Sequence, residues 1–182
     1  MNVKMLKCLD VKMNKGFTLI ESLIVMAMIA ILSLALIPSF QSGRTQLSLD
    51  RSASKLAQDI RGIMEKAMSS QEYSTCGSGF EYGYGIYLEE ATAGSYILFA
   101  DCNGNQEYNS SDKTIEVVPF ESGISILNLN TTNKKLDIVF EPPDPIVYIS
   151  GGSSASIIIQ SSQYTEKKKT ININKVGLID IN

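Results

Sequence analysis

The sequence has no histidine and no tryptophan, and its 182 residues include only three cysteines and five prolines. Without histidine the chain cannot form a Ser-His-Asp or Cys-His nucleophile, nor any metal site that uses a histidine ligand. Three cysteines are too few for a small fold that is built on disulfides. No familiar nucleophile motif or phosphate-binding loop is present, so we expect a protein that is not an enzyme.

Charge of either sign is also scarce. Charged residues make up 19% of the chain, and 16 basic against 19 acidic residues give a formal net charge of -3. Because there is no basic excess, the composition predicts no general binding of nucleic acid. The one basic run, residues 167–169, is either a solvated loop or a contact for DNA or anionic lipid; its shortness favours the loop.

Apolar residues gather near the N-terminus. Residues 17–37 form an apolar run in which Glu21 is the one charged residue, and four lysines precede it. As a helix the run is roughly 31 Å long, which matches the hydrocarbon thickness of a bilayer. Since the basic side stays in the cytoplasm, we expect a single pass through the cytoplasmic (inner) membrane with the remainder on the extracytoplasmic side.

A cleaved signal peptide is the alternative to a retained membrane helix. The run exceeds the usual apolar core of a signal peptide, and SLALIPSF at 33–40 is a poor cleavage site. A carboxylate at Glu21 costs about 2.5–3.5 kcal/mol inside a membrane, so it needs a partner. A free amine at Phe17, four positions earlier, would be that partner, which favours cleavage before the run.

Residues 15–21, KGFTLIE, resemble the cleavage and methylation site of type IV prepilins and type II secretion pseudopilins. The resemblance implies that a membrane peptidase cuts after Gly16 and then N-methylates Phe17. It also implies that Glu21 pairs with the amine of a neighbouring subunit during assembly. Pro38 falls where the membrane helix of that family often carries a proline, and we assign it to assembly too.

The expected fold is α+β, with a long N-terminal helix packed on an antiparallel β-sandwich head. We expect a cleaved leader at 1–16, starting at Met1 or Met13, and a transmembrane and filament-core helix at 17–40. An amphipathic helix at 41–76 then packs on a β-rich globular head at 77–182. The helix should run from Phe17 to about Glu72. Its apolar stripe is predicted at Ala53, Leu56, Ala57, Ile60, Ile63, Met64, Ala67 and Met68.

The second half of the chain reads as short strands between turn residues. Isoleucine, valine and aromatic residues recur in runs that glycine, proline, asparagine or serine separates. The predicted strands are 84–88, 96–100, 114–119, 124–129, 136–140, 146–149, 155–160, 170–174 and 176–181.

Several head segments narrow the resemblance to GspH/FimT-type minor pseudopilins of type II secretion and minor pilins. They are residues 55–61, 84–87, 100–105, 140–145 and 176–179. The resemblance implies a structural and assembly subunit of a secretion or type IV pilus filament. Its partners would be other pilin or pseudopilin subunits, the prepilin peptidase and methyltransferase, the assembly platform, and membrane lipid before assembly. The alternative is a competence- or adhesion-type minor pilin whose head binds DNA or a surface ligand.

One loop of the head carries oxygen side chains at every second position. Calcium takes six to eight oxygen ligands, so this spacing suits a calcium site, although glycine at the fourth position and strand flanks exclude an EF-hand. The candidate ligands are Asp101, Asn103, Asn105, Glu107 and Asp112. The alternative is a hairpin loop that turns at Asn103–Gly104. No cofactor is required.

Two cysteines, Cys76 and Cys102, remain after cleavage of the leader. Outside the cytoplasm two cysteines are expected to pair. Two free thiols are the alternative, because the sequence gives no distance between them.

Overall fold

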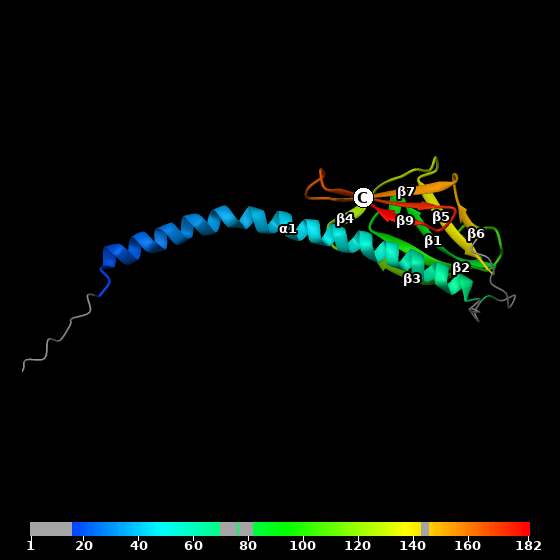
Figure 1. Ribbon diagram of the computed structural model, residues 1–182, viewed down its shortest axis with the longest axis horizontal. Helices are drawn as coiled ribbons and strands as arrows, with labels where there is room; N and C mark the ends of the chain where they lie inside the picture. Colours follow the sequence, from blue (N-terminus) through cyan, green and yellow to red (C-terminus); the bar gives the residue numbers. More distant parts are fainter. Residues whose placement is uncertain (1–15, 70–75, 77–81, 143–145) are drawn as a thin grey trace, which may run out of the picture. The chain divides into compact units, whose positions relative to one another are not determined.

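The structure is a computed structural model that describes residues 16–69, 76, 82–142 and 146–182, with the backbone alone at 35–39. Contacts divide the chain into two compact units, Met1–Phe40 and Gln41–Asn182. One helix, α1 (Leu19–Met68), contributes residues to both units (Figure 1).

In the first unit, α1 starts two residues later than predicted. Thr18 precedes the helix, and its Oγ1 accepts a hydrogen bond from the N–H of Glu21 at 3.3 Å. A threonine in this position caps the helix, because it satisfies an N–H that has no partner within the helix. Every side chain of residues 16–34 is exposed. Among the residues that the structure describes, no helix combines the length and hydropathy of a membrane span.

In the second unit, α1 presents an apolar stripe to the head. Seven side chains of this stripe are buried: Leu49, Ala53, Leu56, Ala57, Ile60, Ile63 and Ala67. The stripe confirms the predicted helical period, but Met68 is 53% exposed, so its predicted burial is wrong. At 100° per residue Met68 lies well off the centre of the stripe.

The predicted end of the helix near Glu72 lies outside the described residues. The structure ends α1 at Met68. The hydroxyl of the following Ser69 donates to the carbonyl of Lys66 at 2.9 Å, which occupies one of the carbonyls left free at the helix end.

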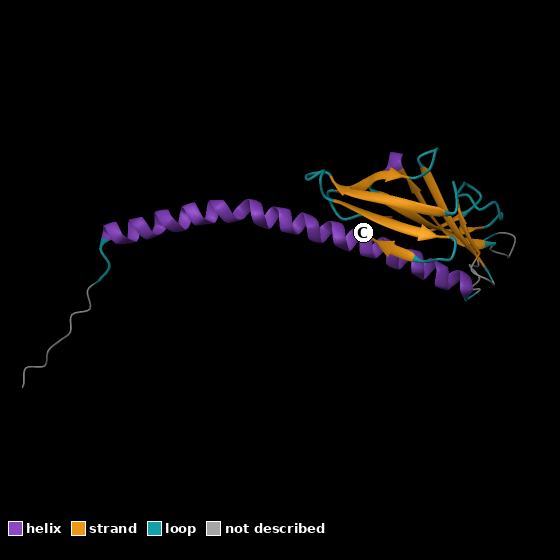
Figure 2. Cartoon of the chain, turned by 45° about the horizontal axis from the view of Figure 1, so that its top comes forward, coloured by secondary structure: helices purple, strands orange, loops and turns teal. Residues whose placement is uncertain are grey.

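The head consists of two antiparallel sheets (Figure 2). The five-stranded sheet has the order β3-β2-β1-β5-β6, and the four-stranded sheet has the order β4-β7-β8-β9. In the first sheet the strands are β1 (Gly83–Glu89), β2 (Ser95–Asp101), β3 (Lys113–Pro119), β5 (Lys135–Glu141) and β6 (Ile146–Ile149). In the second they are β4 (Ile124–Leu129), β7 (Ser154–Ser161), β8 (Lys168–Asn174) and β9 (Ile179–Ile181), and a short 3-10 helix spans Glu90–Thr92.

The α+β prediction is therefore confirmed for a helix packed on antiparallel sheets. All nine predicted strands occur, and only the last differs by more than two residues, since β9 starts at Ile179 instead of Val176. Gly177 has a φ of +80°, which a strand does not allow, so the chain turns there before it pairs with β8. The C-terminal half of α1 lies along the strands in both views (Figures 1 and 2).

The five-stranded sheet is covered on both faces around β1, β2 and β5. Five consecutive residues of β5, Leu136–Phe140, are buried, where a half-exposed strand would alternate. One face meets α1 and the other sheet. On the opposite face Phe99 and Val139 form a second small apolar cluster, against which Tyr108 of the β2–β3 loop packs. That loop is the part of the head in which we predicted chemistry.

Candidate functional site

The predicted cleavage point lies in open chain ahead of α1. Gly16, Phe17 and Thr18 have no regular secondary structure, and the bond between Gly16 and Phe17 precedes the first helical residue. The side chain of Phe17 is 76% exposed. A Cβ at Gly16 would meet nothing within 4 Å. This chain therefore leaves the peptide bond accessible to an enzyme.

Glu21 lies in the first turn of α1, with an exposed side chain. No residue that the structure describes lies within ion-pairing distance of its carboxylate. A carboxylate at this end of a helix is stabilised by the helix dipole. The capping role of Thr18 was not predicted, although residues 18–21 (TLIE) show the T-x-x-E pattern of a capping box.

The backbone of Pro38 lies within α1, whose bounds include it. Its side chain lies outside the described residues. A role of Pro38 in assembly stays a prediction.

A family model of the prokaryotic N-terminal methylation motif matches residues 11–37. The methylation motif supports a type IV pilin-like protein, a subunit that prepilin peptidase processes and that assembles with other pilin subunits. Such subunits are membrane-anchored before they form filaments, and they are structural proteins, which agrees with the expectation of a protein without catalytic activity. No curated protein and no solved structure matches the chain.

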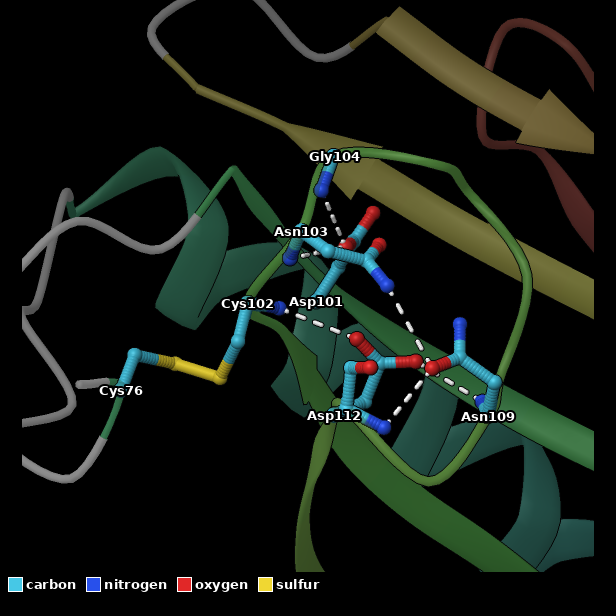
Figure 3. The surroundings of a disulfide bond; sticks show 8 residues. Cys76, Asp101, Cys102, Asn103, Gly104, Asn109 and Asp112 are labelled. Atoms are coloured by element: carbon cyan, nitrogen blue, oxygen red, sulfur yellow. Dashed lines mark hydrogen bonds between the residues drawn. A yellow bond between two sulfur atoms is a disulfide. The ribbon is translucent and has the colours of Figure 1, made fainter. Parts of the chain in front are cut away.

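In the head, a disulfide joins Cys76 to Cys102 across 26 positions, with the two Cα atoms 5.4 Å apart (Figure 3). Cys76 is buried and Cys102 is partly buried. Cys102 directly follows the last residue of β2. The bond therefore ties the chain beyond α1 to the start of the β2–β3 loop.

Asp101 organises that loop from the inside. Its carboxylate is fully buried. Oδ1 accepts hydrogen bonds from the N–H groups of Asn103 and Gly104, and Oδ2 accepts one from Gln106 at 2.9 Å. Three charge-assisted hydrogen bonds compensate the burial of the carboxylate.

Asp112 closes the loop at its other end. Its Oδ1 accepts from the N–H of Cys102 at 3.1 Å, and its Oδ2 accepts from that of Asn109 at 2.8 Å (Figure 3). Burial raises the pKa of Asp112, and the two backbone hydrogen bonds oppose that rise. The side chain thus joins the first residue of the loop to its last turn.

The amide side chains of the loop accept hydrogen bonds in the same way. Asn103 Oδ1 accepts from the N–H of Asn105, and Asn105 Oδ1 accepts from that of Glu107. The described residues contain no group of three or more acidic, cysteine or histidine side chains that could hold a metal ion. Calcium binding by this loop stays a prediction.

The expected tight turn at Asn103–Gly104 is part of a longer loop. Residues 102–112 connect β2 to β3. Gly104 has a φ of +72°, and a Cβ there would lie 2.9 Å from the ring of Tyr82. The predicted glycine turn is thus present, but the antiparallel strands are joined by a loop of eleven residues.

The loop also covers the outer face of the five-stranded sheet. The centroid of the Tyr108 ring lies 5.1 Å from the ring centroid of Tyr87 and 5.1 Å from that of Phe99. The N–H of Tyr108 donates to Oδ1 of the buried Asp137 at 2.9 Å. Burial raises the pKa of Asp137 to about 6. Sequence reasoning missed this residue, because nothing in LDIVF at 136–140 marks the aspartate as facing a loop.

The basic run at 167–169 lies against the helix. Lys167 Nζ donates to the carbonyl and hydroxyl oxygens of Ser42, at 2.5 and 2.7 Å. Lys169 Nζ lies 3.5 Å from Oδ1 of Asp50. Two of the three ammonium groups therefore contact α1, which reduces the charge available to an anionic partner.

Proposed function

We propose that the chain is a minor pseudopilin or minor pilin, a structural subunit of a type II secretion or type IV pilus filament. Prepilin peptidase would cleave it after Gly16 and methylate the new amine of Phe17. The observation that carries the proposal is the methylation motif at residues 11–37, which includes the start of α1 and whose described side chains at 16–34 are all exposed.

The N-terminal part of α1 exposes many large apolar side chains, and their exposure to water is unfavourable. Burial of apolar area contributes about 25 cal/mol per Å², so a helix that exposes large apolar side chains on every side is driven into lipid or against other helices. We propose that residues 17–40 span the inner membrane before assembly and form the filament core afterwards. The head would then lie on the extracytoplasmic side, where the disulfide between Cys76 and Cys102 is chemically stable.

Glu21 is proposed to set the axial register of the filament. Its carboxylate is exposed four positions after Phe17 and has no ion-pairing partner among the described residues of its own chain. In an apolar surrounding an unpaired carboxylate is costly, so the methylated amine of a neighbouring Phe17 would be a strongly preferred partner.

A GspH/FimT-type subunit is the finer proposal. It is supported by a head of two antiparallel sheets packed on a long N-terminal helix. The genes beside this one would distinguish a type II secretion system from a type IV pilus. A secretion ATPase with a secretin and other pseudopilins would indicate secretion, and pilus and competence genes would indicate a pilus.

The processing step is tested by Gly16→Ala in cells that contain a prepilin peptidase. We expect the variant to keep its precursor size on a blot, while the wild-type chain shortens. Because an alanine Cβ at this position meets nothing within 4 Å, a block must arise in the peptidase and not in a misfolded substrate. A mature-sized band for Gly16→Ala would contradict the proposal.

The register role is tested by Glu21→Ala, with Ser22→Ala in the same helical turn as the control. We expect Glu21→Ala to be inserted and processed, but to enter sheared filaments at a tenth of the wild-type level or below, about the loss that 1.4 kcal/mol produces. Ser22→Ala should assemble normally. Normal incorporation of Glu21→Ala would contradict the register role without affecting the processing proposal.

A further inference from the structure

The loop between β7 and β8, residues 162–167, projects from one end of the head and contacts α1 (Figure 1). Lys167 Nζ donates to the carbonyl oxygen of Ser42 at 2.5 Å and to its hydroxyl oxygen at 2.7 Å. Ser161, buried at the end of β7, accepts two N–H groups of the loop at its Oγ. Since both ends of the loop are bonded, its position on α1 is set before anything binds.

The contact at Ser42 keeps the loop close to the proposed membrane span, residues 17–40. Ser42 is two residues beyond the span, and two residues of chain reach at most about 7 Å. A bilayer is about 40–45 Å thick with its headgroups and about 30 Å without them, so each headgroup layer is about 5–8 Å thick. Whenever the span is in a membrane, the ammonium group of Lys167 therefore lies at the level of the lipid headgroups.

Lys167 keeps its positive charge in this contact. Both of its acceptors on Ser42 are uncharged oxygens. An ammonium group has three N–H donors, and the third makes no hydrogen bond with a residue that the structure describes. Lys167 therefore has both a charge and a donor left for an anion beside α1.

The side chains of this region carry an excess of positive charge. Arg44 and Lys168 are exposed, and neither forms an ion pair with a residue that the structure describes. Glu166 is the one acidic residue of the loop. Lys169 is neutralised by Asp50, whose Oδ1 lies 3.5 Å from its Nζ. With Lys167, three uncompensated positive groups stand against one negative group.

The positive groups lie on both sides of the helix. Arg44 follows Ser42 by two residues, which is about 200° around α1. The Cα–Cβ bond of a helical residue tilts toward the N-terminus, so the side chain of Arg44 leans back toward the proposed span. The loop on one side and Arg44 on the other therefore present their charges to the same layer.

We propose that the β7–β8 loop, Lys168 and Arg44 form a binding surface for the headgroups of anionic phospholipids in the extracytoplasmic leaflet. Phosphate oxygens would accept hydrogen bonds from the free donor of Lys167 and from the other two cations. The ring of Tyr164, 5.3 Å from Lys167 Nζ, belongs in the same layer, since tyrosine is enriched at membrane–water interfaces. The inference rests on the proposed function and gives the head a contact with the membrane before assembly.

A lipid surface is favoured over nucleic acid as the source of phosphate. Three cations release few counterions, so they bind DNA from solution weakly. Lipid headgroups, by contrast, are already held beside the loop by the membrane span, and a weak contact is populated at such a high effective concentration. Each lysine or arginine near an anionic membrane surface strengthens binding about fivefold.

The test uses the full chain with Cys8→Ser, reconstituted in vesicles of phosphatidylcholine, alone or mixed with phosphatidylglycerol. The exposed Gln163 is replaced by cysteine and carries a fluorophore, and a quencher is attached to the lipid headgroups. We expect strong quenching in the vesicles with phosphatidylglycerol and its loss in high salt, which screens charges at a surface. Quenching that is equal in the two kinds of vesicle, or absent from both, would overturn the proposal.

Lys168→Gln tests the charge of the loop, with Lys175→Gln as the matched control. Both lysines are exposed, but Lys168 begins β8 and Lys175 follows its end, about 23 Å away along the strand. Lys168→Gln should lower the ratio of bound to free loop about fivefold, and Lys175→Gln should leave it unchanged. Glu166→Gln should raise the ratio by a similar factor. Equal ratios for the Lys168 and Lys175 variants would overturn the proposal.

Two further measurements separate the possible outcomes. If duplex DNA changes the fluorescence in neutral vesicles as strongly as phosphatidylglycerol does, the surface is not specific to lipid and the proposal is overturned. A second fluorophore at Ala27→Cys, with a quencher on the acyl chains, reports on the span itself. Quenching at residue 27 without quenching at residue 163 overturns the headgroup surface alone, whereas no quenching at residue 27 contradicts the membrane span of the proposed function.

Discussion

Two buried aspartates of the head serve the same loop with different electrostatic consequences. Asp101 accepts three backbone N–H groups, so its charge is compensated where it is buried. Asp137 accepts one, from Tyr108, and lies at 7% exposure beneath the loop. Burial with few donors favours the protonated form, which is why the pKa of Asp137 rises to about 6.

Asp137 makes the stability of the head depend on pH. Burial is the main cause of the raised pKa, Glu107 and Asp112 add to it, and the N–H of Tyr108 and the charge of Lys135 oppose it. An aspartate in the unfolded chain titrates near about 3.9. Between about pH 4 and 6 the folded chain therefore binds more protons, so the free energy of unfolding falls as the pH rises through this range.

Asp137→Asn should flatten this fall. Urea unfolding between pH 4 and 7.5 should show the wild-type head losing on the order of 2 kcal/mol more than the variant, with no further difference above pH 7. Asparagine keeps an oxygen for the N–H of Tyr108, so the loop is preserved. Parallel pH profiles for the two proteins would show that Asp137 titrates normally.

At the scale of elements, strands were the most predictable part of this chain. Short runs of isoleucine, valine and aromatic residues bounded by turn residues are a local signal of a strand, so all nine strands could be located from the sequence. The end of the chain was predicted less well, because the apolar residues of 176–178 read as a strand, whereas Gly177 has a φ of +80° and the N–H groups of 176–178 all donate to Asn174.

The β2–β3 loop shows how one residue pattern serves two purposes. Oxygen side chains at every second position can surround calcium, but they can equally accept hydrogen bonds from backbone N–H groups two or three residues on. Asp101, Asn103 and Asn105 each accept such a bond, and Asp112 accepts one from the N–H of Asn109, three residues before it. Sequence spacing is the same in both cases, so only the conformation of the backbone distinguishes them.

We expect this loop to depend on its hydrogen bonds and not on calcium. Asp101→Asn removes one acceptor oxygen and should lower the free energy of unfolding by about 2 kcal/mol, with or without calcium. Saturating calcium should leave Tm unchanged, because N–H groups already point at the carboxylate oxygens. Thermal melting of both proteins with calcium and with a chelator measures this.

Glu107→Gln is the control for the loop, since the Glu107 side chain is exposed. It should alter Tm little. A rise of Tm with calcium in the wild-type chain that Asp101→Asn abolishes would instead support the calcium site.

At the scale of the whole molecule, the disulfide connects the two ends of a segment whose chain leaves α1 and returns through β1 and β2. It closes 26 positions of chain. In the chain-entropy model a loop of this length stabilises the folded state by roughly 3 kcal/mol, because the unfolded chain has fewer conformations. The head should therefore be markedly less stable in reducing conditions.

Urea unfolding with and without reductant measures the effect of the disulfide. We expect the midpoint to fall on reduction, and the double variant Cys76→Ser, Cys102→Ser to unfold at the lower midpoint without responding to reductant. Two thiols that can be alkylated in the native, non-reduced protein would contradict the pairing.

The sequence by itself determined the N-terminal motif, the apolar run behind it, the helical stripe and the strands. These features depend on neighbouring residues or on a short repeat, so they can be recognised in the sequence without knowledge of the fold. Gly16, Phe17 and Glu21 could be named for the same reason, since their order and spacing are contiguous.

Only the tertiary structure decided which distant residues meet. The proximity of Cys76 and Cys102, the burial of Asp137 beneath Tyr108 and the contact of Lys167 with Ser42 all depend on how the helix and the sheets pack. Packing arises from burial of apolar area over the whole head, which no local pattern of residues specifies.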